Sequence, residues 1–283
     1  MDRRGFLGAL PATALALRGL PGADPIRSAA APARFLTLDV IGVQLYTVRS
    51  LMASDPDGTL AQIAAIGYRA VEFAGLYGLT PREMRGRLDA LGLRAVSSHQ
   101  SVQEVRGRWD QVLEGAQELG QRLIVVPSIP GRERTADGLR RIADDFNRAG
   151  EAARSAGLRF GYHNHSWEFA PWDDGTVPID LLLERCDAEL VDWQVDLFWV
   201  VDGGGDPLAY VEANGARVTS VHVKDRTASG DMVAVGDGVI DFETILRRAE
   251  ELGTEYAFVE HDSPRDPLES VRRSYRYLRT LAG

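Results

Sequence analysis

The sequence predicts a single α/β domain folded as a (β/α)8 barrel, and three observations support this fold class. From about residue 36 onward, short apolar runs alternate with longer amphipathic segments. Such alternation indicates parallel strands joined by helical crossovers. There are eight of these units, and they fit into about 250 residues, the usual size of this barrel. A glycine also separates helix from strand at several junctions.

Each predicted strand is a mostly β-branched, apolar run, as burial on both faces of a parallel sheet requires. The runs occupy residues 38–46, 68–74, 93–99, 122–128, 158–164, 190–198, 218–224 and 256–262. A doubly wound open sheet is the competing architecture, and it needs a glycine-rich phosphate turn after an early strand. The only glycine run, 203–205, follows the sixth predicted strand and lacks the required spacing. The closed barrel is therefore favoured.

Helical periodicity, ended by glycine, predicts that the segments between the strands are helices. Residues 59–67 place Leu60, Ile63 and Ala64 on one face, and residues 139–157 form a longer amphipathic stretch. A glycine ends the predicted helix before each of five strands, at Gly67, Gly92, Gly120, Gly157 and Gly253. We expect these glycines to adopt the positive φ that commonly ends a helix.

Residues 1–34 are excluded from the fold prediction because they resemble an export signal. Arg3 and Arg4 precede a short apolar stretch, and residues 28–33 (SAAAPA) supply the small residues that signal peptidase accepts. The paired arginines resemble a twin-arginine signal, and the stretch is too short for a stable membrane span. We expect an export signal over residues 1–34, a catalytic barrel over residues 35–283, and a periplasmic or other extracytoplasmic location.

Composition restricts the partners and the kind of site. The 283 residues include 32 Lys and Arg against 41 Asp and Glu, a formal net charge of -9. Because such a chain repels a phosphate backbone, we expect no nucleic-acid partner. The single cysteine, Cys186, cannot form an intrachain disulfide or a cysteine-based metal cluster. Any metal site must therefore consist of histidines and carboxylates.

All five histidines fall at the predicted carboxyl ends of strands, where barrels of this class carry their chemistry. His99 ends the third strand, His163 and His165 the fifth, His222 the seventh and His261 the eighth. In a chain where most residues lie in helices or loops, this placement indicates a functional site at that end of the barrel.

Carboxylates follow the same rule and are embedded in apolar runs. Glu72 lies near the end of the second strand, Asp196 of the sixth and Glu260 of the eighth, and Asp225 follows the seventh. A buried carboxylate needs a basic partner or a metal ion. Asp196, His222 and Glu260 lie on consecutive strands and together predict a metal site. Oxygen and nitrogen ligands without sulfur suit Mn²⁺, Co²⁺, Zn²⁺ or Mg²⁺.

Seven motifs carry a resemblance to a known family. They are GVQLYTVR (42–49), YRAVEFAG (68–75), GYHNHSWEF (161–169), WQVDLFWV (193–200), VHVKDR (221–226), VGDGVIDF (235–242) and VEHD (259–262). Through them the chain resembles the xylose isomerase-like TIM barrel superfamily, in the branch of sugar phosphate isomerases and epimerases. The resemblance covers about residues 38–281 and implies one divalent metal ion at the mouth of the barrel.

The resemblance implies four metal ligands, and three match this sequence directly. These three are Asp196, His222 and Glu260. The fourth is normally a glutamate on strand five, but the matching stretch FGYHN contains no acid. We expect Glu168, just beyond that strand, to be the fourth ligand, with His163 or His165 as the alternative.

A metal ion of this kind would bind a carbonyl and a neighbouring hydroxyl, acidify the adjacent C–H bond and stabilise an enediolate. The candidates for the general base are Glu260, His163 and His165. Lys224 follows His222 by two residues and therefore projects on the same side of the strand. We expect it to neutralise an oxyanion or to hold a substrate hydroxyl; a salt bridge with Asp196 or Glu260 is the alternative.

Further polar and aromatic residues near strand ends are predicted to contact the substrate. They are Gln44, Glu72, His99, Trp167 and Asp225. A purely structural histidine is the alternative for His99.

The predicted function is a divalent-metal-dependent isomerase or epimerase of a keto-sugar or polyol. One alternative is a dehydratase or lyase acting on 3-keto-sugars or keto-inositols, and another is a non-catalytic sugar-binding barrel. The loops after strands seven and eight lack a glycine-rich phosphate cradle. We therefore expect an unphosphorylated small-molecule sugar or keto-sugar as partner, and we leave open whether the chain forms a homo-oligomer.

Overall fold

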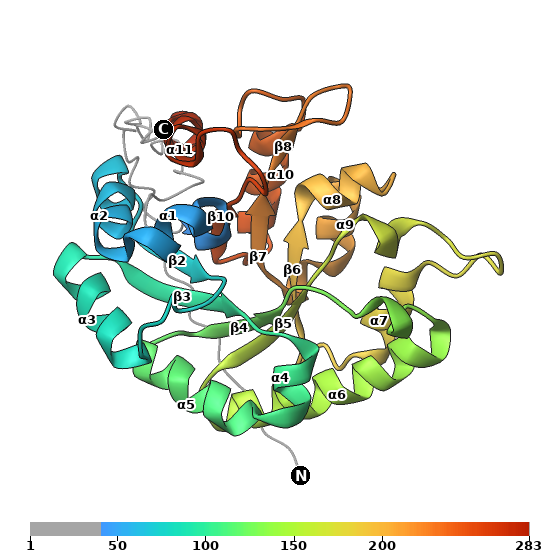
Figure 1. Ribbon diagram of the computed structural model, residues 1–283. Helices are drawn as coiled ribbons and strands as arrows, with labels where there is room; N and C mark the ends of the chain where they lie inside the picture. The colour runs from blue at the N-terminus through green and yellow to red at the C-terminus, as the bar shows by residue number, and fades with distance from the viewer. Residues whose placement is uncertain (1–40, 283) are drawn as a thin grey trace, which may run out of the picture. The chain divides into compact units, whose positions relative to one another are not determined.

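The computed structural model describes residues 41–282 and shows a closed barrel of eight parallel strands enclosed by helices (Figure 1). The strands are β1 (Ile41–Gln44), β2 (Ala70–Phe73), β3 (Arg94–His99), β4 (Leu123–Val126), β5 (Arg159–His163), β6 (Asp192–Asp196), β7 (Val218–Val223) and β10 (Tyr256–Val259). Their hydrogen-bonded order is β1-β10-β7-β6-β5-β4-β3-β2, closing on β1. The predicted (β/α)8 barrel is confirmed; the export signal predicted for residues 1–34 lies outside the described residues.

Helices follow the strands and pack on the outside of the barrel (Figure 1). They are α1 (Arg49–Ser54), α2 (Pro56–Ile66), α3 (Pro81–Leu91), α4 (Val102–Gly107), α5 (Trp109–Leu119), α6 (Ala136–Ser155), α7 (Pro178–Arg185), α8 (Leu197–Asp202), α9 (Pro207–Asn214), α10 (Phe242–Glu251) and α11 (Pro267–Leu281). Within residues 41–282, no helix is both long enough and apolar enough to cross a membrane.

The carboxyl end of β6 differs from the sequence prediction. The apolar run 190–198 was expected to remain a strand, but β6 ends at Asp196 and α8 begins at once. The Asp196 carboxylate accepts a hydrogen bond from the backbone N–H of Trp199 at 3.0 Å and so caps this short helix. A second difference is the antiparallel hairpin of β8 (Asp225–Arg226) and β9 (Met232–Val233), which follows β7.

The last helix, α11, holds the start of β2 through two tyrosines. The hydroxyl of Tyr68 donates to the carbonyl of Val271 at 2.9 Å, and the hydroxyl of Tyr275 donates to the carbonyl of Gly67 at 2.8 Å. The two rings lie 4.8 Å apart. Gly67 has φ +125°, and a Cβ atom there would lie 2.5 Å from the Tyr275 ring. Glycine is therefore required here for its φ angle and for the close approach of Tyr275.

We expect Gly67→Ala to destabilise the barrel more than Gly92→Ala. Gly92 has φ +66° with no atom within 4 Å of its missing Cβ, so alanine there adds only backbone strain of about 1 kcal/mol. Alanine at position 67 adds the steric conflict with Tyr275, for a total of roughly 3 kcal/mol. Urea unfolding of both variants measures the difference, and equal losses would contradict the packing role of Gly67.

Candidate active site

A pocket of about 490 Å³ opens at the carboxyl ends of the barrel strands, within the size range of small-molecule sites. Five residues predicted from the sequence line it: His99, His163, His165, Lys224 and Glu260. They come from β3, β5, the segment after β5, and the residues that follow β7 and β10. The fold thus brings together side chains that are up to 161 positions apart in the sequence, from His99 to Glu260.

Glu72, on β2, lies beneath this pocket and is fully buried. Its Oε1 accepts hydrogen bonds from His222 Nε2 at 2.6 Å and Gln44 Nε2 at 2.8 Å, and lies 3.1 Å from His99 Nε2. Its Oε2 accepts from Gln194 Nε2 at 2.8 Å. Burial raises the pKa of Glu72, but the two histidines outweigh it and hold that pKa well below its usual value. Glu72 is therefore ionised and accepts hydrogen bonds from four side chains.

His222 is held between two carboxylates. Besides its bond to Glu72, its Nδ1 lies 2.7 Å from Glu260 Oε2. Burial lowers the pKa of His222, but Glu72 and Glu260 outweigh it and raise the pKa to about 10. The ring orientation is consequently fixed at both nitrogens.

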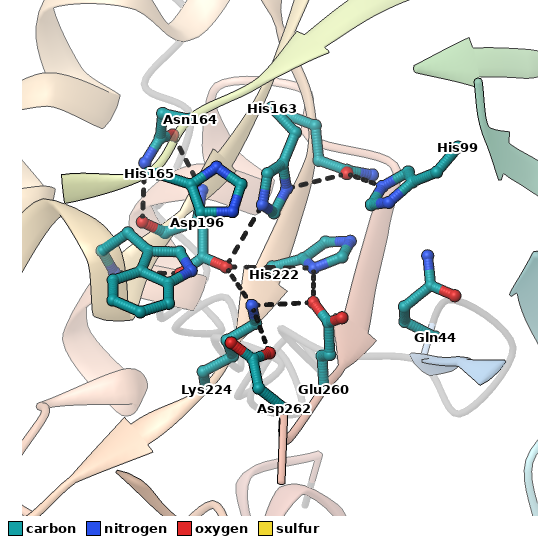
Figure 2. Close-up of polar contacts among 12 residues, drawn as sticks. Gln44, His99, His163, Asn164, His165, Asp196, His222, Lys224, Glu260 and Asp262 are labelled. Carbon is teal, nitrogen blue, oxygen red and sulfur yellow. Dashed lines mark hydrogen bonds and ion pairs between the residues drawn. The ribbon is translucent and has the colours of Figure 1, made fainter. Parts of the chain in front are cut away.

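Lys224 lines the pocket and lies among three carboxylates (Figure 2). Its Nζ is 3.1 Å from Asp196 Oδ2, 2.9 Å from Glu260 Oε2 and 2.9 Å from Asp262 Oδ1. Burial lowers the pKa of Lys224, but these three carboxylates keep it above its ordinary value. The salt-bridge alternative for Lys224 is therefore the arrangement that the structure shows.

The carboxylates in this cluster differ in their proton affinity. Burial raises the pKa of Asp196 to about 6, even though Lys224 and His222 act against it. Burial also raises the pKa of Glu260, but Lys224 and His222 outweigh it and hold the pKa well below its ordinary value. Glu260 is thus an ionised group and a weak proton acceptor.

The predicted metal ligands Asp196, His222 and Glu260 converge on one point. Asp196 Oδ2 is 4.0 Å from His222 Nδ1, which is 2.7 Å from Glu260 Oε2. Asp196 Oδ2 is buried and, apart from its ion pair with Lys224, has no hydrogen-bond donor within the described part of the chain. His163 Nε2 lies 3.6 Å from the same oxygen (Figure 2). Metal bonds of about 2.1 Å place adjacent ligand atoms about 3 to 3.5 Å apart, so small side-chain movements would fit a divalent ion here.

Glu168, predicted as the fourth ligand, is engaged elsewhere. It lies in the 3-10 helix Ser166–Phe169, where Oε1 accepts the Tyr162 hydroxyl and Oε2 accepts the backbone N–H of His165 at 2.9 Å. Burial raises its pKa to about 8. Glu168 does not join the cluster around Asp196, because the turn after β5 directs its carboxyl group toward Tyr162.

Asp225, predicted to contact substrate, holds a loop instead. Its carboxylate accepts the backbone N–H groups of Arg226 at 2.8 Å, Gly236 at 2.9 Å, Gly238 at 2.9 Å and Ile240 at 3.3 Å. The last three of these bonds hold the VGDGVI segment against the end of β7. Asp225 therefore shapes the rim of the barrel and has its acceptors occupied.

Three further predicted substrate contacts also lie away from the pocket surface. Gln44 is fully buried, and its two polar atoms bind Glu72 and the N–H of Tyr46. Glu72 is occupied as described above. Trp167 is not part of the pocket lining and packs against the guanidinium of Arg134, 4.6 Å from its ring centre. Of the five predicted substrate contacts, only His99 lines the pocket.

Some site residues escaped the sequence prediction. Asn164, between the two histidines of YHNH, accepts the N–H of Asp196 at 3.0 Å and donates to its carbonyl at 3.2 Å. It also accepts the indole N–H of Trp193 at 3.0 Å. Asn164 therefore fixes the end of β6, and its place in that motif was the available signal. Gln194 was the other omission, because an amide inside an apolar strand resembles an ordinary interior residue.

The sequence and the fold of this chain are similar to those of known proteins. A family model described as Xylose isomerase-like TIM barrel matches residues 60–281. An inosose dehydratase of Geobacillus kaustophilus is 24% identical over 302 residues, covering 90% of this chain and 92% of that protein. A sugar phosphate isomerase/epimerase from Parabacteroides distasonis superposes with a TM-score of 0.74 at 28% identity, covering 93% and 99% of the two chains.

The structure of a 3-keto-D-glucoside 4-epimerase from E. coli is also similar. It superposes with a TM-score of 0.64 at 17% identity and covers 85% of this chain and 99% of its own. At this level of identity the likeness concerns the fold alone.

We expect Glu168→Gln to change how stability depends on pH. Because the pKa of Glu168 rises from 4.5 to about 8 on folding, wild-type stability falls as pH rises through that interval. The neutral variant lacks this loss. Its free energy of unfolding should therefore gain roughly 4 kcal/mol on the wild type between pH 4.5 and pH 8.5, as measured by urea unfolding. Glu114→Gln, at an exposed position of α5, is the control; a pH-independent difference for Glu168→Gln would contradict the burial argument.

Proposed function

The chain belongs to the xylose isomerase-like TIM barrel family, and we propose that it removes the proton beside the carbonyl group of a keto-sugar or keto-polyol with the help of a divalent metal ion. The convergence of Asp196, His222 and Glu260 carries this proposal, with Glu260 lining a sugar-sized pocket and the other two buried beside it. The non-catalytic sugar-binding barrel has no need of such a cluster.

Four side chains would hold the metal ion in this proposal. They are Asp196 through Oδ2, His222 through Nδ1, Glu260 through Oε2 and His163 through Nε2. His163 takes the place first expected for Glu168. A divalent ion bound there supplies Lewis acidity that makes a C–H bond beside a carbonyl easier to ionise.

His165 is the proton acceptor that we propose. It lines the pocket and lies outside the metal-binding group, with its ring centre 5.2 Å from that of His163. Burial lowers the pKa of His165 to about 4, so its imidazole is unprotonated at neutral pH and is a stronger proton acceptor than the Glu260 carboxylate, whose pKa is held lower still. Lys224, already paired with three carboxylates, offsets their charge rather than neutralising a substrate oxyanion.

Elimination of water is the outcome that we propose first. After taking the proton from carbon, the His165 imidazolium returns it to a β-hydroxyl group, which leaves as water while the C–C double bond forms. The similarity to inosose dehydratases over most of both chains supports placing elimination before epimerisation. Epimerisation, expected first from the sequence, is the second candidate. Strand β5 offers His163 in place of the glutamate that the resemblance assigns to the opposed acid/base pair.

The charge of the pocket favours an uncharged substrate. Among the described residues that line it, Lys224 is the one lysine or arginine, and Glu104, Glu260 and Asp262 are acidic. The Lys224 ammonium is paired with Glu260, Asp262 and Asp196, so the described lining offers no unpaired lysine or arginine to receive a phosphate or carboxylate group. We therefore propose a neutral keto-sugar or keto-inositol. Export through residues 1–34, a proposal from the sequence alone, would place the reaction outside the cytoplasm.

A solvent-exchange experiment tests the reaction. The protein loaded with Mn²⁺, Co²⁺ or Zn²⁺ is incubated in D₂O with a keto-inositol or a 3-keto-glucoside, and exchange and loss of water are followed by NMR and mass spectrometry. We expect deuterium at the carbon beside the carbonyl together with a product lighter by one water. His165→Ala should slow exchange about 100-fold or more, while metal content stays unchanged.

His261→Gln is the matched control, because His261 also follows a strand end but binds Ser270 outside the pocket lining. It should exchange at the wild-type rate. Sugar binding without exchange in the metal-loaded wild type would contradict the proposal and support the binding-protein alternative.

A further inference from the structure

Gln194 lies in the middle of β6 and is fully buried beneath the pocket. Its side chain touches two of the histidines that line the pocket. Its Oε1 is 2.9 Å from His99 Nε2 and 3.2 Å from His163 Nδ1. The proposed reaction assigns no catalytic or binding role to Gln194.

Glu72 determines which way the Gln194 amide faces. An ionised carboxylate only accepts hydrogen bonds, so the group 2.8 Å from Glu72 Oε2 must be the NH₂ of Gln194. The same NH₂ lies 3.1 Å from the Ser220 hydroxyl. The amide oxygen is consequently turned toward the two imidazoles, where it acts as an acceptor.

This orientation selects the proton position on each ring. Because Gln194 Oε1 only accepts hydrogen bonds, His99 must carry its proton on Nε2 and His163 on Nδ1. In the neutral rings, His163 Nε2 and His99 Nδ1 then hold lone pairs. His163 Nε2 lies 3.6 Å from Asp196 Oδ2, and His99 Nδ1 has no hydrogen-bond partner among residues 41–282.

We propose that Gln194 is a positioning residue that fixes the tautomer of His163 and, together with Glu72, whose Oε1 lies 3.1 Å from His99 Nε2, the tautomer of His99. It presents His163 Nε2 as an acceptor beside Asp196 and His99 Nδ1 as an acceptor for a substrate hydroxyl. The consequence for metal binding rests on the proposed function: only the tautomer with a bare Nε2 lets His163 replace the missing acid of strand β5 as a ligand. A histidine held by an outer partner in this way binds metal more tightly.

The histidine tautomers can be read directly from long-range ¹H–¹⁵N correlation spectra at pH 7, with and without Zn²⁺. The informative variant is Gln194→Met, which keeps the side-chain length and removes the acceptor. Gln44→Met is the matched control, because Gln44 is equally buried and also donates to Glu72 at 2.8 Å, yet does not touch His99 or His163.

In the wild type we expect a protonated Nδ1 on His163 and a protonated Nε2 on His99. Gln194→Met should lose the Nδ1 proton preference of His163 and bind Zn²⁺ about 10- to 100-fold more weakly. His99 should keep its proton on Nε2, because Glu72 Oε1 lies 3.1 Å from that nitrogen. Gln44→Met should keep the wild-type tautomers, whatever its effect on affinity through Glu72 and His222.

A proton on Nε2 of His163 in the zinc-free wild type, or an unchanged pattern in Gln194→Met, would overturn the proposal. The wild-type spectrum gives this answer even where Gln194→Met does not fold. A different outcome separates the two proposals. If the wild type shows the expected tautomers but binds none of the divalent ions, the metal-dependent reaction is contradicted and the positioning role of Gln194 is still supported.

Discussion

The ionised carboxylate of Glu72 is the constraint on which the polar interior of this barrel depends. A buried charge of this kind is tolerated only when hydrogen-bond donors surround it, and the barrel supplies donors from β1, β3, β6 and β7. Because Glu72 only accepts, it sets the orientation of every partner. His222 must point Nε2 toward it, and the amides of Gln44 and Gln194 must turn their NH₂ groups inward.

His222 connects this interior network to the charged cluster of the pocket. Its second nitrogen faces Glu260, and Glu260 shares the ammonium of Lys224 with Asp196. A metal ligand must present an unprotonated nitrogen. Under the proposed function, a metal ion bound at His222 Nδ1 would displace the proton that lies between His222 and Glu260. The hydrogen bond from His222 Nε2 to Glu72 would then keep the ring in place.

Sequence patterns predicted which strand ends carry the chemistry, since eight apolar runs define the parallel strands and their carboxyl ends. They did not predict how deeply each polar side chain is buried in the barrel. Glu72 and Gln44 are neighbours on adjacent strands, are fully buried and bind each other below the pocket lining. Glu168 was misplaced for a different reason: the turn after β5 pairs it with Tyr162, a local contact that spacing does not encode. Asp225 similarly accepts three backbone N–H groups from a loop 11 to 15 residues away.

Anomalous X-ray diffraction from crystals of the Mn²⁺-loaded protein tests the central claim most directly. The account predicts one strong peak within about 2.3 Å of Asp196 Oδ2, His222 Nδ1, Glu260 Oε2 and His163 Nε2. Lys224 should then be displaced from Asp196 and Glu260 and remain paired with Asp262. Full occupancy of a manganese ion elsewhere, with Lys224 still bridging the three carboxylates, would contradict the account.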